Sequence, residues 1–249
     1  MSGHSKWSSI KHKKGAADAK RGKLFTKLVK EIIVAAREGG GNPEMNPRLR
    51  LAITTARNNN MPGSNIEKAI KKGTGELEGV KYESYTYEGY GHNGVAIIVE
   101  TLTDNKQRTV SDIRHIFSKF GGNLAENGSV SWIFEPKGKI EIAKKGVDED
   151  ELMMTALDAG AEDFSSENEN HEIFTAYSNL HTVHKILEEN GYQIEKAEQT
   201  RIPKNTVNAD NVAEKLLKLL DQLEDNDDVQ KVYANFEISN EIIERLSVD

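Results

Sequence analysis

The chain has 249 residues, of which 37% are hydrophobic and 29% charged, a composition typical of a globular protein with two or three domains. It contains no cysteine, which excludes disulfides, thiolate metal sites and cysteine nucleophiles. The longest apolar run, residues 95–99, is too short to cross a bilayer. No apolar stretch follows the N-terminal charges, as it would in a secretory signal, so we expect a cytoplasmic protein with no membrane partner.

Charge is distributed unevenly along the chain. Residues 1–75 hold 16 of the 33 Lys and Arg residues but only five acidic residues, a net charge of +11, whereas the rest of the chain carries −18. Such a division is typical of a protein that binds a polyanion through one part of its chain. A basic segment that only aids solubility is the alternative on charge alone.

Residues 1–19 are predicted to form a basic, flexible tail. Lysines and histidines alternate there with small residues, and only Trp7 and Ile10 are large and apolar. Such a segment buries too little apolar surface to offset the entropy of ordering it. An exposed Trp7 would stack on a nucleobase while the lysines contact phosphates. Packing of its indole against the following helices is the alternative.

Residues 20–80 are predicted to form a helical bundle domain. The first helix, residues 18–37, has apolar residues on one half of the helical wheel and a row of basic residues within roughly 100° on the other. The second helix covers residues 46–59. The third follows Gly63, with Ser64 and Glu67 as a capping box, and stops at Gly73. Because each helix is short, the three must share one core.

From residue 81 the pattern changes to strands and helices. Residues 135–200 predict strand, helix, strand, strand, helix, strand, which is the ferredoxin-like order. The flanking segments predict a second such unit, with strands at 95–102, 130–134, 198–202 and 229–238 and helices at 105–120 and 209–224. The expected fold class is α+β, with an N-terminal three-helix bundle and two ferredoxin-like α/β domains. Residues 81–134 plus 201–240 would form one of them, discontinuous in sequence, and residues 135–200 the other, inserted in it.

A glycine motif in the strand region resembles a cofactor site only in its letters. Gly89-x-Gly91-x-x-Gly94 matches the dinucleotide fingerprint, which requires a helix to follow it. A strand follows instead, so the glycines favour a hairpin loop. The sequence also contains no phosphate-binding Walker motif.

Other candidate chemistry is equally weak. His181 and His184 lie one helical turn apart without further ligands nearby, which favours a surface pair over a metal site. The acidic residues 148–151 open a helix, where their charge favours the helix dipole. No nucleophile elbow singles out a catalytic triad. We therefore expect no enzymatic activity, no cofactor and no metal.

Short motifs throughout the chain are similar to those of YebC-type proteins. They are Met1-Ser2-Gly3-His4-Ser5-Lys6-Trp7, Ile10-Lys11-His12-Lys13-Lys14, Asp18-x-Lys20-Arg21, Phe25-x-Lys27, Asn60-Met61-Pro62, Tyr87-Glu88-Gly89-Tyr90-Gly91, Leu102-Thr103-Asp104-Asn105 with Arg108-Thr109, and Gly128-Ser129-Val130. The chain departs from the family pattern at His92-Asn93-Gly94, where Pro-Gly-Gly is usual, and at Leu124-Ala125, where Leu-Gly is usual.

The resemblance implies a helical N-terminal domain and two α/β domains, one inserted in the other, and it attaches no catalytic residue to the chain. Bacterial YebC-type proteins are generally described as DNA-binding transcriptional regulators. Mitochondrial relatives are translational activators of cytochrome c oxidase, and some bacterial members are described as ribosome-associated factors that relieve stalling. The resemblance therefore implies a regulator of gene expression and leaves promoter DNA and ribosomal RNA open as its target.

The expected nucleic-acid interface combines the tail with basic residues of all three helices. Its residues are Lys6, Trp7, Lys11, Lys13, Lys14, Lys20, Arg21, Lys23, Lys27, Lys30, Arg57, Lys68, Lys71 and Lys72. Lysines dominate and no side chain is placed for bidentate base reading, so phosphate contacts should outweigh sequence readout. A recognition helix and a dimerisation signal are missing, which favours structured RNA and a monomer.

The acidic remainder of the chain leaves further alternatives open. It would repel nucleic acid and so orient the basic end inward, or it would bind the ribosome or another basic protein partner, or fold back on the basic tail of the same chain. In another interpretation the α/β domains bind peptides or proteins and the basic arm is incidental. Loss of nucleic-acid binding on removal of residues 1–22 would exclude that interpretation.

Overall fold

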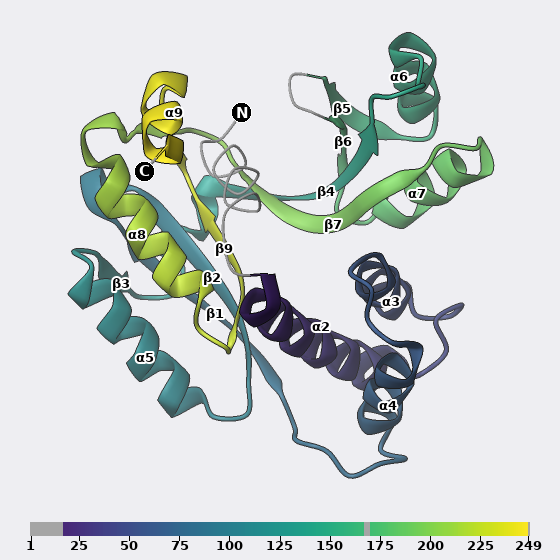
Figure 1. Cartoon of the computed structure of the whole chain (residues 1–249), viewed down its shortest axis with the longest axis horizontal. Coiled ribbons are helices and arrows are strands. Elements are labelled where there is room, and N and C mark those ends of the chain that lie inside the picture. The colour runs from purple at the N-terminus through teal and green to yellow at the C-terminus, as the bar shows by residue number, and fades with distance from the viewer. Residues whose placement is uncertain (1–16, 167–169, 249) are drawn as a thin grey trace.

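From residue 17, where the described part of the chain begins, the N-terminal part folds into three helices that share one core (Figure 1). The structure, a computed structural model, describes residues 17–166 and 170–248, apart from the side chains of residues 17–20, 244, 247 and 248. The helices are α2 (Ala17–Gly39), α3 (Pro47–Asn58) and α4 (Gly63–Thr74). Ile32, Leu49 and Ile66 are buried where their apolar faces meet, as the helical periodicity predicted. We call this unit the N-terminal bundle.

The start of α4 differs from the expected capping box. The helix begins at Gly63 after Pro62, and no side chain caps it. Ser64 therefore lies inside the first turn, and Glu67 forms an ion pair with Lys71 instead of closing a cap. The helix also extends one residue beyond Gly73, and the left-handed φ of 84° at Gly75 then ends it.

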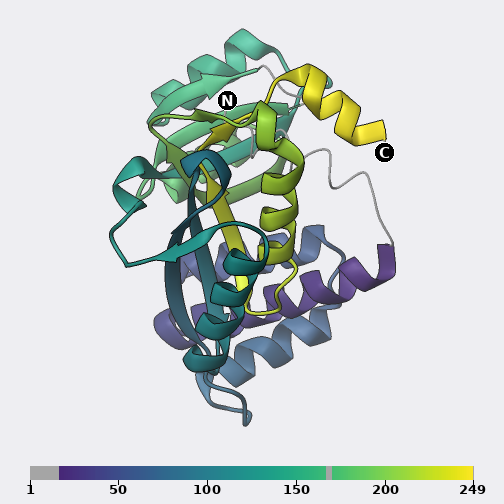
Figure 2. The ribbon, with the colours of Figure 1, turned by 90° about the vertical axis from the view of Figure 1, so that its left-hand side faces the viewer.

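A four-stranded antiparallel sheet in the order β3-β1-β2-β9 forms the next unit, which we call the middle domain. Its elements are β1 (Glu83–Tyr90), β2 (Ala96–Thr103), α5 (Lys106–Lys119), β3 (Asn123–Ala125), α8 (Ala213–Glu224) and β9 (Val229–Ala234). Both helices cover one face of the sheet, as Figure 2 shows, and Ile97, Phe117 and Leu216 are buried between the layers.

This sheet has the ferredoxin-like strand order, but the chain reaches it by a different path from the expected one. Strand β3 takes the position expected for residues 130–134, and β1 takes the position expected for residues 198–202. Residues 131–133 instead form a short 3₁₀ turn, η2 (Ser131–Ile133), and residues 198–202 belong to another sheet. Those two predictions were wrong because a short strand-like run does not reveal which sheet it joins.

The inserted domain has the predicted strand and helix order. It contains β4 (Phe134–Ala143), α6 (Glu149–Asp158), β5 (Ala161–Ser165), β6 (Asn170–Ala176), α7 (Leu180–Glu189) and β7 (Ile194–Pro203). The antiparallel sheet order β5-β6-β4-β7 is the ferredoxin-like arrangement. The long strands β4 and β7 pair from Phe134 opposite Pro203 onward and carry the chain between the two domains (Figure 1).

Short elements complete the described chain. Turn η1 (His92–Gly94) joins β1 to β2, η3 (Asp210–Val212) precedes α8, β8 (Val207–Asn208) pairs in parallel with β10 (Phe236–Glu237), and α9 (Asn240–Val248) follows. The single strand expected at 229–238 is thus interrupted at Asn235, whose side chain accepts a hydrogen bond from the Ala96 N–H at 2.7 Å. Within the described residues, no helix combines the length and apolarity that crossing a membrane requires.

Candidate nucleic-acid interface

The lysine row of α2 faces the C-terminal end of α8. The ammonium groups of Lys23, Lys27 and Lys30 donate to main-chain carbonyl oxygens within residues 224–227, at 3.2, 2.7 and 2.9 Å. The last carbonyls of a helix lack helical donors and carry the negative end of its dipole, so lysines stabilise them. In the conformation seen here these three lysines hold the N-terminal bundle against the middle domain, and the expectation that the row faces phosphates stays a prediction.

A buried carboxylate, Asp228, lies at the centre of this contact. It is 2.9 Å from Lys30 Nζ, and the two side chains are only 7% and 8% exposed. It also accepts hydrogen bonds from Arg108, Thr109 and Thr103. Burial raises the pKa of Asp228, but the hydrogen bonds from Arg108, Lys30 and Thr109 outweigh it and lower the pKa to about 2.

These partners account for one of the motifs shared with YebC-type proteins. Thr103, Arg108 and Thr109 come from the segment around the start of α5, and all three bind the same carboxylate. Asn105 of that segment caps α5 by accepting a hydrogen bond from the Arg108 N–H. In this structure the motif fixes α5 and the contact with the N-terminal bundle.

Glu88 links two further motifs in the same way. Its carboxylate accepts the main-chain N–H groups of Gly128, Val130 and Ser131, at 2.8, 2.7 and 2.9 Å. Burial raises the pKa of Glu88, and these N–H groups lower it by more, so the pKa lies below its ordinary value. The carboxylate therefore fixes the turn that precedes β4.

Helix α3 contacts the inserted domain. Arg50 Nη1 lies 2.6 Å from Nε2 of His181, the second residue of α7. A guanidinium group only donates, so Nε2 accepts and the imidazole is neutral. Burial and the nearby charge of Arg50 lower the pKa of His181. Asn58, at the other end of α3, donates to the Glu195 carbonyl oxygen at 3.2 Å.

The exposed cations of the N-terminal bundle lie on α4, at the end of α3 and near the start of α2. Among the described residues, the predicted interface residues that are exposed and form no ion pair are Arg21, Arg57, Lys68 and Lys72. Arg21 lies over the Phe25 ring at 5.7 Å. Lys68 and Lys72 are one turn apart on the solvent face of α4, beside Lys71, which pairs with Glu67 at 2.8 Å.

Part of the predicted interface lies outside the described residues. This part comprises Lys6, Trp7, Lys11, Lys13 and Lys14 together with the side chain of Lys20. Their contribution stays a prediction from sequence. Among the described residues, α4 and the end of α3 are the best candidates for the folded part of the interface.

The other candidate motifs have structural explanations. Gly94 closes the β1–β2 hairpin with a φ of 72°, as the hairpin interpretation predicted. Asp148 caps α6 by accepting the Glu151 N–H at 3.0 Å. His184 pairs with Glu188 in its own helix. Within the described residues, no group of three or more His, Cys, Asp or Glu side chains is arranged to hold a metal ion.

The fold and these contacts define a three-part α+β protein with exposed, unpaired cations on its N-terminal helical bundle. Residues 5–76 match the sequence model of the TACO1/YebC protein N-terminal domain, and residues 82–236 match that of the TACO1/YebC second and third domain. The chain belongs to the TACO1/YebC family.

Relatives resemble the chain over its whole length. A probable transcriptional regulatory protein of Dictyoglomus turgidum is 60% identical over 249 residues, which cover 99% of this chain and 100% of the relative. A protein of the same name from Thermotoga maritima is 58% identical over 248 residues, which cover 99% of this chain and 98% of the relative. The crystal structure of a conserved hypothetical protein from Aquifex aeolicus is 54% identical, covers 94% of this chain and 97% of that one, and gives a TM-score of 0.85. These likenesses confirm the resemblance found in the sequence and the α+β fold.

Proposed function

We propose that this protein is a non-enzymatic regulator of gene expression that binds nucleic acid through its N-terminal bundle and basic tail. The observation that carries the proposal is that Arg57, Lys68 and Lys72 are exposed and form no ion pair, in a segment whose net charge is strongly positive. Lysines held on a helix surface meet phosphates without restricting the base sequence. The name given to the relatives, probable transcriptional regulatory protein, supports the regulatory role.

The contacts of Lys23, Lys27 and Lys30 on α2 limit the part of the surface that can bind phosphates. Lys30 is buried, and Lys23 and Lys27 already bind carbonyl oxygens of the middle domain. In this arrangement the phosphate backbone runs along α4 and the end of α3. The net negative charge of the middle and inserted domains would repel the phosphates and so help to orient the molecule.

A salt titration tests the proposal directly. Fluorescence anisotropy of the full chain with duplex DNA and with a hairpin RNA would give the slope of log affinity against log salt concentration. Each neutralised phosphate contributes about 0.9 to that slope on duplex DNA. We expect Lys68→Gln with Lys72→Gln to flatten the slope by about 2.

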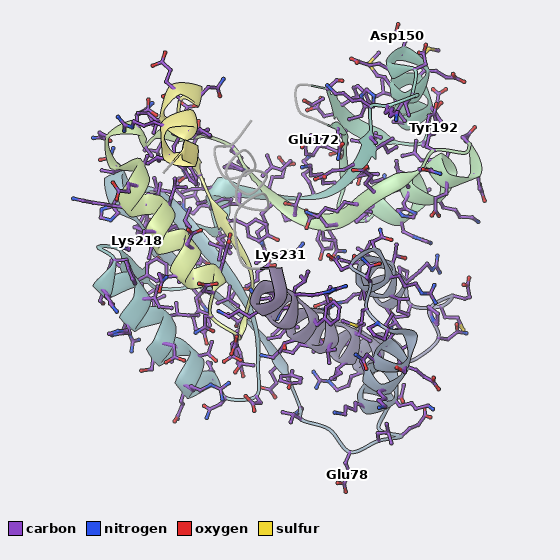
Figure 3. The ribbon with its side chains drawn as sticks, viewed as in Figure 1. Glu78, Asp150, Glu172, Tyr192, Lys218 and Lys231 are labelled. Carbon is purple, nitrogen blue, oxygen red and sulfur yellow. The ribbon has the colours of Figure 1, made fainter. Side chains whose placement is uncertain are left out.

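The matched control is Lys215→Gln with Lys218→Gln. These lysines are also exposed on one amphipathic helix, α8, but belong to the acidic part of the chain (Figure 3 labels Lys218). The control changes the net charge equally and should leave the slope unchanged. Equal effects of the two pairs would mean that only net charge matters and would count against an interface on α4.

Structured RNA is the second candidate target. No described helix presents a row of arginine, asparagine or glutamine side chains for base reading in a major groove, and the unpaired cations are mostly lysines. Ultraviolet crosslinking in cells, followed by sequencing of the attached nucleic acid, separates the candidates. Promoter DNA would support transcriptional regulation, and a single cluster of sites on ribosomal RNA would support a role in translation.

A further inference from the structure

The loop between α2 and α3 exposes a large apolar side chain for which the fold gives no reason. Met45 is 81% exposed, more than any other large hydrophobic residue that the structure describes. A methionine in such a position gains nothing from the core of its own protein. Residues that bind other molecules are disproportionately found on loops held by a rigid scaffold.

The backbone around Met45 is held in one shape from the inside. The buried Asn46 amide donates to the carbonyl oxygens of Ala35 and Gly40, both at 2.8 Å. Arg50 donates to the carbonyl oxygens of Pro43 and Glu44, at 2.9 and 2.6 Å. These bonds cost the loop its conformational freedom during folding, so little entropy remains to be lost when the loop binds a partner.

The glycines before the loop leave room for the Asn46 side chain that anchors it. A Cβ atom on Gly39 would lie 2.6 Å from the Asn46 amide nitrogen, and Gly40 has a φ of +84°. Any larger residue at Gly39 would displace the side chain that anchors the loop. The glycine run, which the sequence marks only as the end of α2, therefore helps to fix the backbone of the loop that carries Met45.

The loop lies beside the helix that carries the unpaired lysines. A Cβ atom on Gly41 would lie 2.7 Å from a methyl carbon of Thr74 and 3.2 Å from one of Ile70, which places the loop against the last turns of α4. Lys68 and Lys72 occupy the solvent face of those turns. The loop that carries Met45 and the last turn of α4, which carries Lys72, thus lie at the same end of the N-terminal bundle.

We infer that Met45 is an apolar wedge that inserts beside an unpaired nucleobase of a nucleic acid whose phosphates lie on α4. This inference rests on the proposed function and adds its contact with the bases. Methionine is among the apolar residues that proteins insert between base steps. Its unbranched, polarizable side chain adapts to any base face, which suits an interface without sequence readout.

The test uses full-length protein and a hairpin RNA that carries 2-aminopurine in its single-stranded loop. Insertion of an apolar side chain separates the fluorescent base from its neighbour and raises its emission. We expect this rise with the wild-type protein and its loss in Met45→Ala, together with an affinity about tenfold lower, as for the removal of one buried methionine side chain. Met45→Leu should retain most of both signals.

Two comparisons separate the wedge from other effects. The slope of affinity against salt should not change in Met45→Ala, because the side chain carries no charge. Met154→Ala is the matched control, since Met154 is also exposed, at 64%, but lies on α6 of the inserted domain. Met154→Ala should bind the RNA with wild-type affinity and raise the 2-aminopurine emission as much as the wild type does.

The possible results distinguish the two proposals. Salt-dependent binding by the wild type with no effect of Met45→Ala would overturn the wedge and leave the proposed function in place. Absence of any salt-dependent binding by the wild type would overturn both. If Met45→Ala leaves RNA binding intact but abolishes a protein contact, the loop docks into a protein pocket and the inference is wrong.

Discussion

The pKa of Asp228 links the charge of one side chain to the stability of the fold. Its folded pKa is about 2, against an ordinary value of 3.8. A carboxyl group with a depressed pKa contributes stability that is complete above the unfolded pKa and is lost as the pH falls through the folded pKa. The shift corresponds to about 2 kcal/mol. We therefore expect the free energy of unfolding, measured with urea, to fall by about 2 kcal/mol more in the wild type than in Asp228→Asn when the pH is lowered from about 4 to about 2.

The variant itself should be less stable at neutral pH. Asp228→Asn leaves the buried ammonium group of Lys30 without its counter-charge, and breaking a buried ion pair costs about 3 kcal/mol. Glu67→Gln is the control, because Glu67 also loses a lysine partner, Lys71, but its side chain is largely exposed. If the wild type and Asp228→Asn lost the same stability on acidification, the role assigned to this carboxylate would be wrong.

Single residues also show where sequence reasoning stops. The sequence shows the surplus of basic residues in the first 75 positions, but it does not show which of their ammonium groups face solvent. Lys30 and Asp228 are separated by 198 positions, and Asp228 stands in a polar run, residues 225–228, that is typical of a solvated loop. Only the folded chain shows that these two charges meet in a buried site.

At the scale of elements, the close approach of α2 and α4 depends on one glycine. A Cβ atom on Gly73 would lie 2.5 Å from the Ile33 carbonyl oxygen and 2.7 Å from the Ala36 Cβ. Both neighbours belong to the buried face of α2 and have no room to move. We expect Gly73→Ala to destabilise the protein by about 1–3 kcal/mol, as measured by thermal or urea unfolding.

The same substitution at Gly22 should change the stability in the opposite direction. Gly22 lies inside α2, and a Cβ atom there would meet no other atom within 4 Å. Alanine has the higher helix propensity, so Gly22→Ala should stabilise the chain by about 0.5–1 kcal/mol. If both variants were destabilised, the close contact between Gly73 and α2 would not be what distinguishes the two sites.

The elements themselves could largely be predicted, whereas their partners could not. Helical periodicity identified α2, α3 and α4, and the order of the inserted domain was evident from the sequence. The cap at Ser64 and the sheet positions of residues 130–134 and 198–202 were wrong. Periodicity records which face of an element is buried, but the strand that lies beside it is decided by contacts between distant segments. The loop that carries Met45 gave no signal beyond its glycines.

At the scale of the whole molecule, polar contacts join the three units in pairs. Lys27 and Lys30 join the N-terminal bundle to the middle domain, and Arg50 joins it to the inserted domain. Lys231 of β9 joins the middle domain to β7, 2.8 Å from Glu198 and 2.6 Å from the carbonyl oxygen of Gln199. Figure 3 shows Lys231 near the centre of the molecule. Interfaces of this polar kind allow relative motion more readily than a shared apolar core.

Lys231 therefore should control how firmly the middle and inserted domains are held together. Burial raises the pKa of Glu198, and Lys231 and Lys196 lower it to about 2, so the carboxylate is charged at neutral pH and needs its partners. Lys231→Gln removes one of them together with the bond to β7. We expect the distance between the two domains to increase and its distribution to broaden.

The absence of cysteine from the chain makes this measurable by energy transfer between two dyes. Lys218→Cys on α8 and Asp150→Cys on α6 place the dyes on exposed positions of the middle and inserted domains (Figure 3). Lys137→Gln is the matched control, because Lys137 pairs with Glu135 and Glu162 inside the inserted domain and touches no other unit through these bonds. It should leave the transfer efficiency unchanged. An unchanged efficiency in Lys231→Gln as well would mean that the other contacts, namely the pairing of β4 with β7 and the bridge through the N-terminal bundle, hold the two domains without this lysine.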